Sequence, residues 1–269
     1  MNNLRSLTIA SLNILFLAFN MIGITSASER SIVGVHLGMT LDEAQVVVQE
    51  SVPEIRLTEL SGDVGSLWKS RIRGITYTSG IRGYTDYRSN IGASKIAIMG
   101  HAPPNEGKVS AIGRTANLEE MLLTDFRAAL IEKYGNPNFE TEPGELRSIG
   151  GVLISWSLTK DGKPQTSAEN ILACARHNNK QAQDTVGFVT GLTFPEEQFY
   201  GQYKDCGYTL VVIASQGRLP ETVRAYSVIL YDLNDIHKAN SDTLAMAERE
   251  AKKLEEKQRK EAQGKKPQL

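Results

Sequence analysis

The stretch that most constrains the fold is residues 34–45, GVHLGMTLDEAQ, which has the pattern of a short strand, a glycine turn and a capped helix. Thr40 and Glu43 have the spacing of a capping box, in which each side chain bonds the other residue's backbone N–H. Gly38 supplies the backbone freedom that the turn needs. The helix should end before Pro53, because the residue before a proline is disfavoured in helical geometry. Its apolar face is Leu41, Ala44, Val47 and Val48.

The helix start Gly38-Met39-Thr40-x-x-Glu43 resembles the GMT helix start of small exported bacterial envelope domains. The outer-membrane assembly lipoproteins of the SmpA/OmlA type are the best-known members of that group. The resemblance covers this one stretch and implies an exported envelope protein. Those lipoproteins also carry an N-terminal lipid-bearing cysteine. This chain has no cysteine before Cys174, so a lipid anchor is not implied.

Residues 1–27 have the order of a secretory signal peptide. Arg5 precedes an apolar run, Leu7–Ile24, which is followed by small residues up to Ala27. This order predicts export to the periplasm or beyond, with cleavage after Ala27. The alternative is an uncleaved membrane anchor, since the run is near the length that spans a bilayer, although two asparagines interrupt it. Any membrane contact would then depend on the uncleaved signal.

Cys174 and Cys206 are the only cysteines of the chain. In an oxidising compartment, such a pair most simply forms a disulfide, which we expect here. Two alternatives are buried free thiols and a metal site shared with His177, three residues after Cys174. The cysteines lack the CxxC spacing typical of metal sites. We therefore expect no metal and no cofactor.

The rest of the chain up to residue 232 predicts an α+β fold, with short helices packed on mostly antiparallel strands. Two alternating runs, Lys95–Met99 and Lys108–Ile112, flank a loop of turn formers and predict a hairpin. A second helix, Met121–Tyr134, should end at Gly135. Residues 167–176 fit either a strand or a short helix. The other expected strands are residues 54–60, 66–78, 151–158, 186–194, 208–214 and 223–231.

Residues 28–232 therefore form the predicted globular region. It divides into two units that each contain a helix followed by strands, residues 34–116 and 117–232. These units could be duplicated halves or parts of one sheet.

From Leu233 the chain predicts a long charged helix that reaches about Ala262, followed by a short tail to residue 269. Asn240 interrupts its apolar seam midway. One interpretation is a solvated helix that docks only its first turns on the domain. The other is a coiled-coil-like helix for a protein partner or for self-association. The candidate interaction residues are Leu233, Ile236, Leu244, Ala247, Ala251 and Leu254.

The formal net charge of −1 argues against a dedicated nucleic-acid-binding protein. The sequence contains no nucleophile elbow, P-loop, dinucleotide fingerprint or HExxH motif, so no catalytic residues are assigned. We expect an exported, non-catalytic protein that acts through protein interaction. The alternative is a periplasmic hydrolase or small-ligand-binding protein that uses His101 or His177. A pocket that joins either histidine to a carboxylate would favour this alternative.

Overall fold

A computed structural model describes residues 30–64, 75–85, 91–143, 145, 151–175 and 205–263 of the chain. The predicted signal peptide, the predicted strand at residues 186–194 and His177 lie outside these residues. The elements are α1 (Leu41–Ser51), β1 (Arg56–Asp63), β2 (Thr76–Tyr84), β3 (Ser94–Gly100), β4 (Val109–Leu122), α3 (Leu123–Tyr134), β5 (Phe139–Glu140), β6 (Gly151–Thr159), α4 (Ala168–Ala175), β7 (Cys206–Gln216), β8 (Thr222–Asp232) and α7 (Leu233–Gln263).

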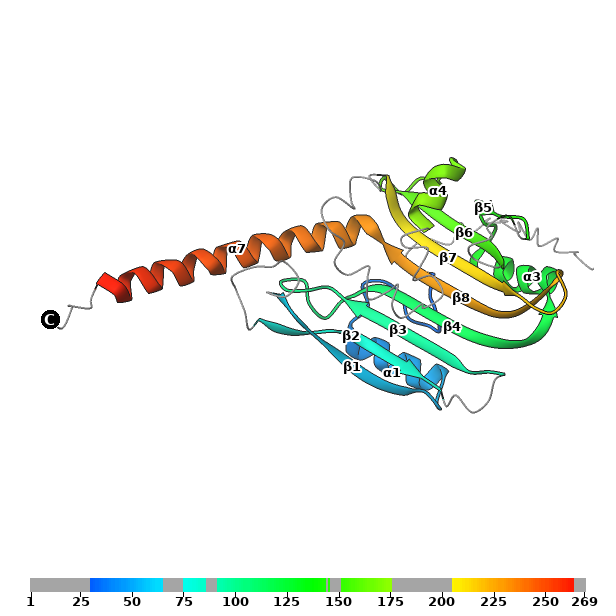
Figure 1. Cartoon of the computed structure of the whole chain (residues 1–269), viewed down its shortest axis with the longest axis horizontal. Coiled ribbons are helices and arrows are strands. Elements are labelled where there is room, and N and C mark those ends of the chain that lie inside the picture. The colour runs from blue at the N-terminus through cyan, green and yellow to red at the C-terminus, as the bar shows by residue number, and fades with distance from the viewer. Residues whose placement is uncertain are drawn as a thin grey trace, which may run out of the picture.

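The described strands form one eight-stranded sheet with the order β1-β2-β3-β4-β8-β7-β6-β5, in which all neighbours are antiparallel (Figure 1). The predicted α+β fold is therefore confirmed. In each half of the chain, a helix precedes four strands that lie side by side in sequence order. Pairing of β4 with β8 joins the halves. The two predicted units therefore share one continuous sheet, and the second unit also contains α4, between β6 and β7.

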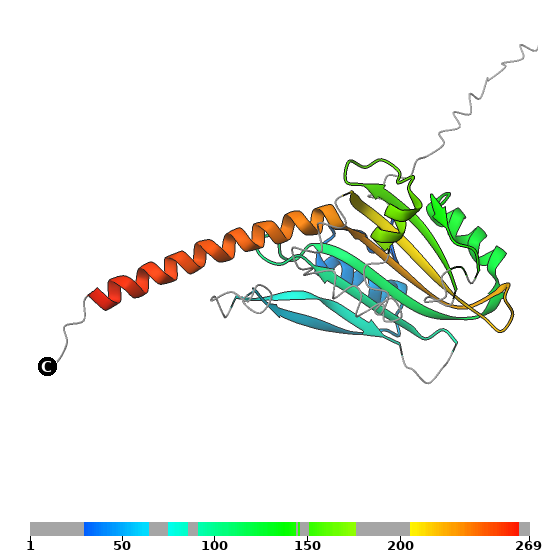
Figure 2. The same cartoon turned by 45° about the horizontal axis from the view of Figure 1, so that its top comes forward.

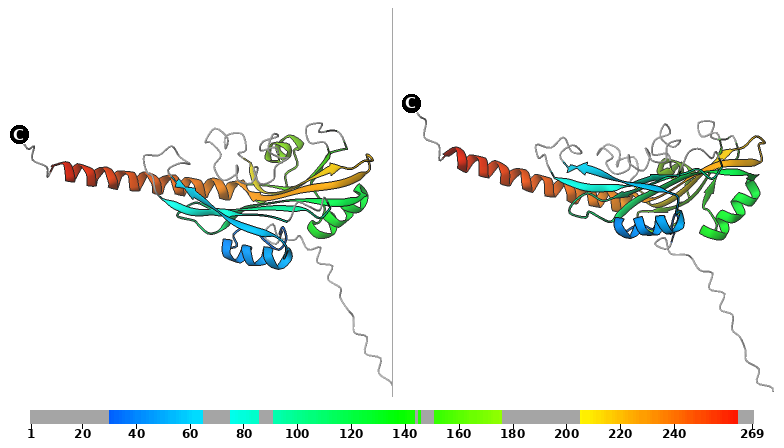
Figure 3. Two further views of the ribbon diagram at one scale, coloured as in Figure 1. Left: turned by 60° about the horizontal axis from the view of Figure 1, so that its bottom comes forward. Right: turned by 90° about the horizontal axis from the view of Figure 1, so that it is seen from below.

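Helices α1 and α3 lie on the same face of the sheet, and α4 lies on the opposite face (Figure 3). Buried side chains of α1 and α3 share one hydrophobic core with the strands. Directly paired residues form a row across the sheet on this face, which we name the central row. The central row consists of Glu59, Ile81, Ile98, Ile112, Leu230, Leu210 and Trp156.

The capping box of α1 is present. The Thr40 side chain accepts a hydrogen bond from the Glu43 backbone N–H, and the Glu43 carboxylate accepts one from the Thr40 N–H. Gly38 has a φ of 81°, as its turn requires. The predicted short strand before Gly38 is instead a tight turn, in which Ile32 and Val35 bond each other's backbone.

Helix α3 begins at Leu123, two residues later than predicted, because Met121 and Leu122 still pair with β8. Its end is as predicted, with Gly135 at a φ of 77°. The ambiguous segment around residues 167–176 is helical and forms α4.

A disulfide joins Cys174 of α4 to Cys206 at the start of β7, with a Cα–Cα distance of 5.7 Å. Both cysteines are buried. They pack in a cluster that includes Leu233 and Ile236 of α7. The disulfide therefore lies at the base of the C-terminal helix.

Candidate functional site

The loop between β3 and β4, residues 101–108, holds the first helix of the fold in place. The backbone N–H of Leu41 donates to the carbonyl of Gly107 at 2.8 Å. Immediately beyond the loop, the N–H of Gly38 donates to Val109 and the N–H of Val109 donates to Met39. These bonds fix the start of α1 against the loop.

The same loop also contacts α7. His101 Nε2 lies 2.9 Å from Asp235 Oδ2, and the Asn105 side-chain amide donates to the Asp242 carboxylate at 3.1 Å. The histidine ring is 7% exposed, whereas the Asp235 side chain is 57% exposed. The 101–108 loop therefore connects helices from opposite ends of the chain.

The pair of His101 and Asp235 lies in a small pocket of about 260 Å³. The hydrogen bond from His101 lowers the pKa of Asp235, and the nearby charges of Lys238 and Lys108 act in the same direction. Burial alone would raise the pKa of Asp235, but the hydrogen bond and the charges together lower it by more. The pocket is lined by Gly38, His101, Asn105, Lys108, Asp235, Lys238, Ala239 and Asp242.

A histidine that bonds a carboxylate can act as a base toward a water molecule. None of the described residues that line this pocket is a serine, threonine or cysteine, so they provide no hydroxyl or thiol nucleophile. The sequence marked His101 as a candidate, but no motif pointed to Asp235, which is 134 residues away. The structure thus brings one predicted histidine to a carboxylate.

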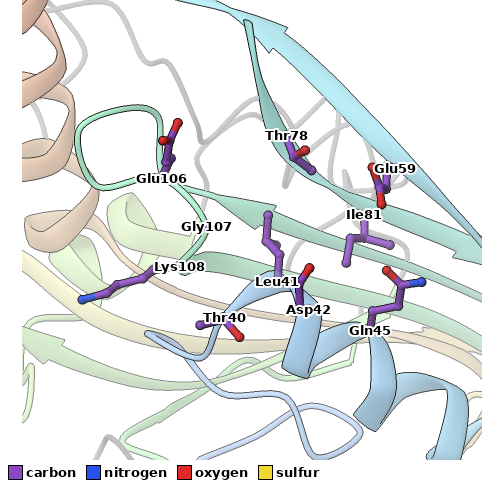
Figure 4. A pocket seen from close by; sticks show the side chains of 10 residues that line it. All are labelled: Thr40, Leu41, Asp42, Gln45, Glu59, Thr78, Ile81, Glu106, Gly107 and Lys108. Carbon is purple, nitrogen blue, oxygen red and sulfur yellow. The ribbon is translucent and has the colours of Figure 1, made fainter.

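A larger pocket of about 530 Å³ lies on the other side of the 101–108 loop, between α1 and the strands β1 and β2 (Figure 4). Leu41 and Ile81 are its buried apolar members. Its polar lining consists of Thr40, Asp42, Gln45, Glu59, Thr78, Glu106, Gly107 and Lys108. Across the described part of the chain, no three histidine, cysteine or carboxylate side chains are placed to hold a metal ion.

Helix α7 is 31 residues long, which corresponds to about 46 Å, and it projects away from the sheet (Figures 1 and 2). Its buried residues are Leu233, Ile236, Ala239, Asn240, Thr243 and Ala247. From Lys252 to Gln263 every residue is exposed. The first half of the helix therefore packs on the domain, and residues 252–263, which we name the free end, are exposed; both sequence interpretations allow this arrangement.

The structure separates the candidate interaction residues into three groups. Leu233, Ile236 and Ala247 are buried and hold α7 on the domain. Leu244 and Leu254 are exposed by 39% and 46%. Ala251 is partly buried beside Ala247. Of the six residues, Leu244 and Leu254 therefore have the most exposed large apolar side chains.

Replacing Asp235 with asparagine should lower the melting temperature at neutral pH by about 2 °C, because the bond to His101 loses its charge while solvent screening keeps the loss small. The pKa of Asp235 is lower in the folded protein than its ordinary value of 3.8. Its ionised form therefore stabilises the fold above that pH, and the contribution disappears as the pH falls below it. Thermal unfolding between neutral pH and about pH 3 measures this effect.

The matched control is Asp242→Asn on the same helix, because its partner Asn105 is uncharged. A difference between wild type and Asp235→Asn that persists unchanged in acid would contradict the assigned role of the carboxylate.

No helix in the described ranges is long and apolar enough to cross a membrane. In comparisons with known proteins, the chain matches no protein-family model, no curated protein and no solved structure. The function is therefore inferred from the residues and geometry of the chain itself.

Proposed function

We propose that the protein is exported and acts, without catalysis, by binding another protein through the exposed end of α7. The observation that carries this proposal is Leu254. It is 46% exposed within residues 252–263 of α7, where every residue is exposed and most are charged. A large apolar side chain in that position is suited to a partner surface.

The free end of α7, residues 252–263, is helical and exposed, and side-chain pairs along the helix support it. Lys253 bonds Glu250 at 2.7 Å, and Glu248 and Lys252 have the favourable i,i+4 spacing. A segment that is already helical loses less conformational entropy on binding than a disordered one. The free end of α7 is therefore preorganised for a partner.

Two further features support export. The disulfide between Cys174 and Cys206 is compatible with an oxidising compartment. Residues 1–27 have the composition of a secretory signal. The resemblance of the GMT helix start to exported envelope domains agrees with both.

The test compares crosslinked capture from envelope extract by the mature chain and by a variant that ends after Ala251. This endpoint keeps the docked residues through Ala247, so the domain should remain folded. We expect a specific partner to be lost on truncation and to be weakened by Leu254→Asp, because the apolar contact is replaced by a charge. Glu256→Gln, a control on the opposite side of the same exposed segment, should retain the partner.

A partner recovered equally by the mature chain, the truncated variant and Leu254→Asp would exclude the free end of α7 as its binding site. Circular dichroism of each variant checks that the domain is intact. Titration of the purified partner then gives the change in dissociation constant.

A second candidate function is hydrolysis or small-ligand binding, which the bond between His101 and Asp235 favours. With no hydroxyl or thiol nucleophile among the described residues of that pocket, hydrolysis here is assigned to a water molecule activated by His101. His101→Gln should then abolish turnover of a model ester while the fold persists. Turnover that survives the substitution would exclude this role.

A further inference from the structure

Strand β1 forms one edge of the sheet. It is eight residues long and pairs with β2 on one side, and no described strand pairs with its other side. Among the described residues, the backbone groups on that side therefore have no strand partner, and such an edge can pair with another strand. Extended peptides commonly bind proteins by adding to such an edge.

The central row shows what an added strand would meet on the α1 face. Glu59 pairs with Ile81, which pairs with Ile98, so an apolar row ends in a carboxylate at the open edge. A residue directly opposite Glu59 on an added strand would point to the same face, because paired residues share a face. Opposite charges stabilise such a cross-strand pair.

The 530 Å³ pocket lies beside this position. Figure 4 shows Asp42 and Gln45 directed from α1 toward Glu59 and Ile81 of the sheet. Carboxylates from three different elements line the pocket, namely Asp42 of α1, Glu59 of β1 and Glu106 of the 101–108 loop, against one cation, Lys108. The buried side chains of Leu41 and Ile81 supply an apolar surface beneath them. A side chain with an aliphatic stem and a cationic head matches both features.

We propose that β1 binds an extended segment of another protein as an additional strand, with a lysine or arginine opposite Glu59. The aliphatic stem of that residue lies over Leu41 and Ile81, and its charge lies among the carboxylates. This surface is separate from the free end of α7 and does not depend on it.

The charge pattern of β1 disfavours a second copy of this chain as the added strand. Arg56 is the only cation of β1, and it lies three residues from Glu59. Side chains alternate between faces along a strand, so Arg56 and Glu59 are on opposite faces. In an antiparallel pair of β1 strands related by a two-fold axis, the same faces lie together, so Arg56 of one copy cannot lie opposite Glu59 of the other. The partner has to provide the cation.

The test uses the full mature chain and fluorescent probe peptides of about eight residues, the length of β1. Each peptide alternates threonine and valine around one central residue, which is lysine in the first peptide and glutamate in the second. A third peptide repeats the lysine sequence with alternate backbone amides methylated, which blocks strand pairing. Fluorescence anisotropy measures their binding.

We expect the lysine peptide to bind more tightly than the other two. Glu59→Lys should weaken its binding by about tenfold and make the glutamate peptide the preferred one. Glu132→Lys, the same charge change on the exposed surface of α3, should leave the preference unchanged. The variant that ends after Ala251 should bind like the full chain. A negative result for the α7 proposal therefore does not bear on this proposal.

Two results would overturn the proposal. One is equal binding of the methylated and unmethylated lysine peptides, which would make the pocket a site for an organic cation only. The other is the absence of any preference between lysine and glutamate peptides in the folded wild-type protein.

Discussion

Replacing Cys174 and Cys206 together with alanine should lower the free energy of unfolding by about 3 kcal/mol. The disulfide joins residues separated by 32 positions, and a cross-link over such a loop restricts the unfolded chain by about that amount. The effect should be large because the disulfide also lies in the cluster at the base of α7. Urea unfolding at neutral pH, followed by circular dichroism, measures it.

Wild type treated with a reductant is the matched control, because it loses the same covalent bond and keeps both sulfur atoms. It should unfold at nearly the same urea concentration as the double variant. If the double variant and the oxidised wild type unfold together, the disulfide contributes nothing to the stability of this fold.

Trp156→Ala should lower the free energy of unfolding by about 4 kcal/mol, which is within the range observed when a large aromatic side chain is removed from a core. The Trp156 side chain is 2% exposed and lies at the end of the central row. Its ring centroid is 5.6 Å from that of Tyr134, and its indole N–H donates to the carbonyl of Gly135 at 2.9 Å. The substitution therefore removes the contact between β6 and the end of α3. Urea unfolding measures this loss in the free energy of unfolding.

Two comparisons separate packing from the hydrogen bond. Trp156→Phe keeps an aromatic ring and should cost about 1–2 kcal/mol, mainly from the unpaired Gly135 carbonyl. Leu219→Ala removes a large side chain that is 56% exposed and should change stability by less than about 0.5 kcal/mol. Equal losses in Trp156→Ala and Leu219→Ala would show that Trp156 is not part of the core.

Features that depend on neighbouring residues could be predicted from the sequence. The capping box at Thr40, the end of α3 at Gly135 and the start of α7 at Leu233 all follow from local chemistry. The hairpin of β3 and β4 follows from alternation around a loop of turn formers. In each of these cases the residues that determine the element lie close together in the sequence.

The arrangement of these elements depends on contacts between distant segments. Nothing local to β4 indicates that its second neighbour is β8, and the two pockets exist only because the 101–108 loop meets both α1 and α7. The seam of α7 illustrates the same limit. The sequence placed Leu244 in one apolar seam with Leu233, Ile236 and Ala247, but Leu244 is 39% exposed while Thr243 is fully buried, because the domain surface determines which side of the helix is covered.

The most direct test of the proposed function is photo-crosslinking in living cells, with a photoreactive amino acid at position 254 or at position 256. The two positions lie about 200° apart around α7, so they face opposite sides of the same exposed segment. We expect one defined protein adduct from position 254 and little or none from position 256. Equal labelling from both positions, or no adduct from either, would contradict binding through the apolar side of the free end of α7.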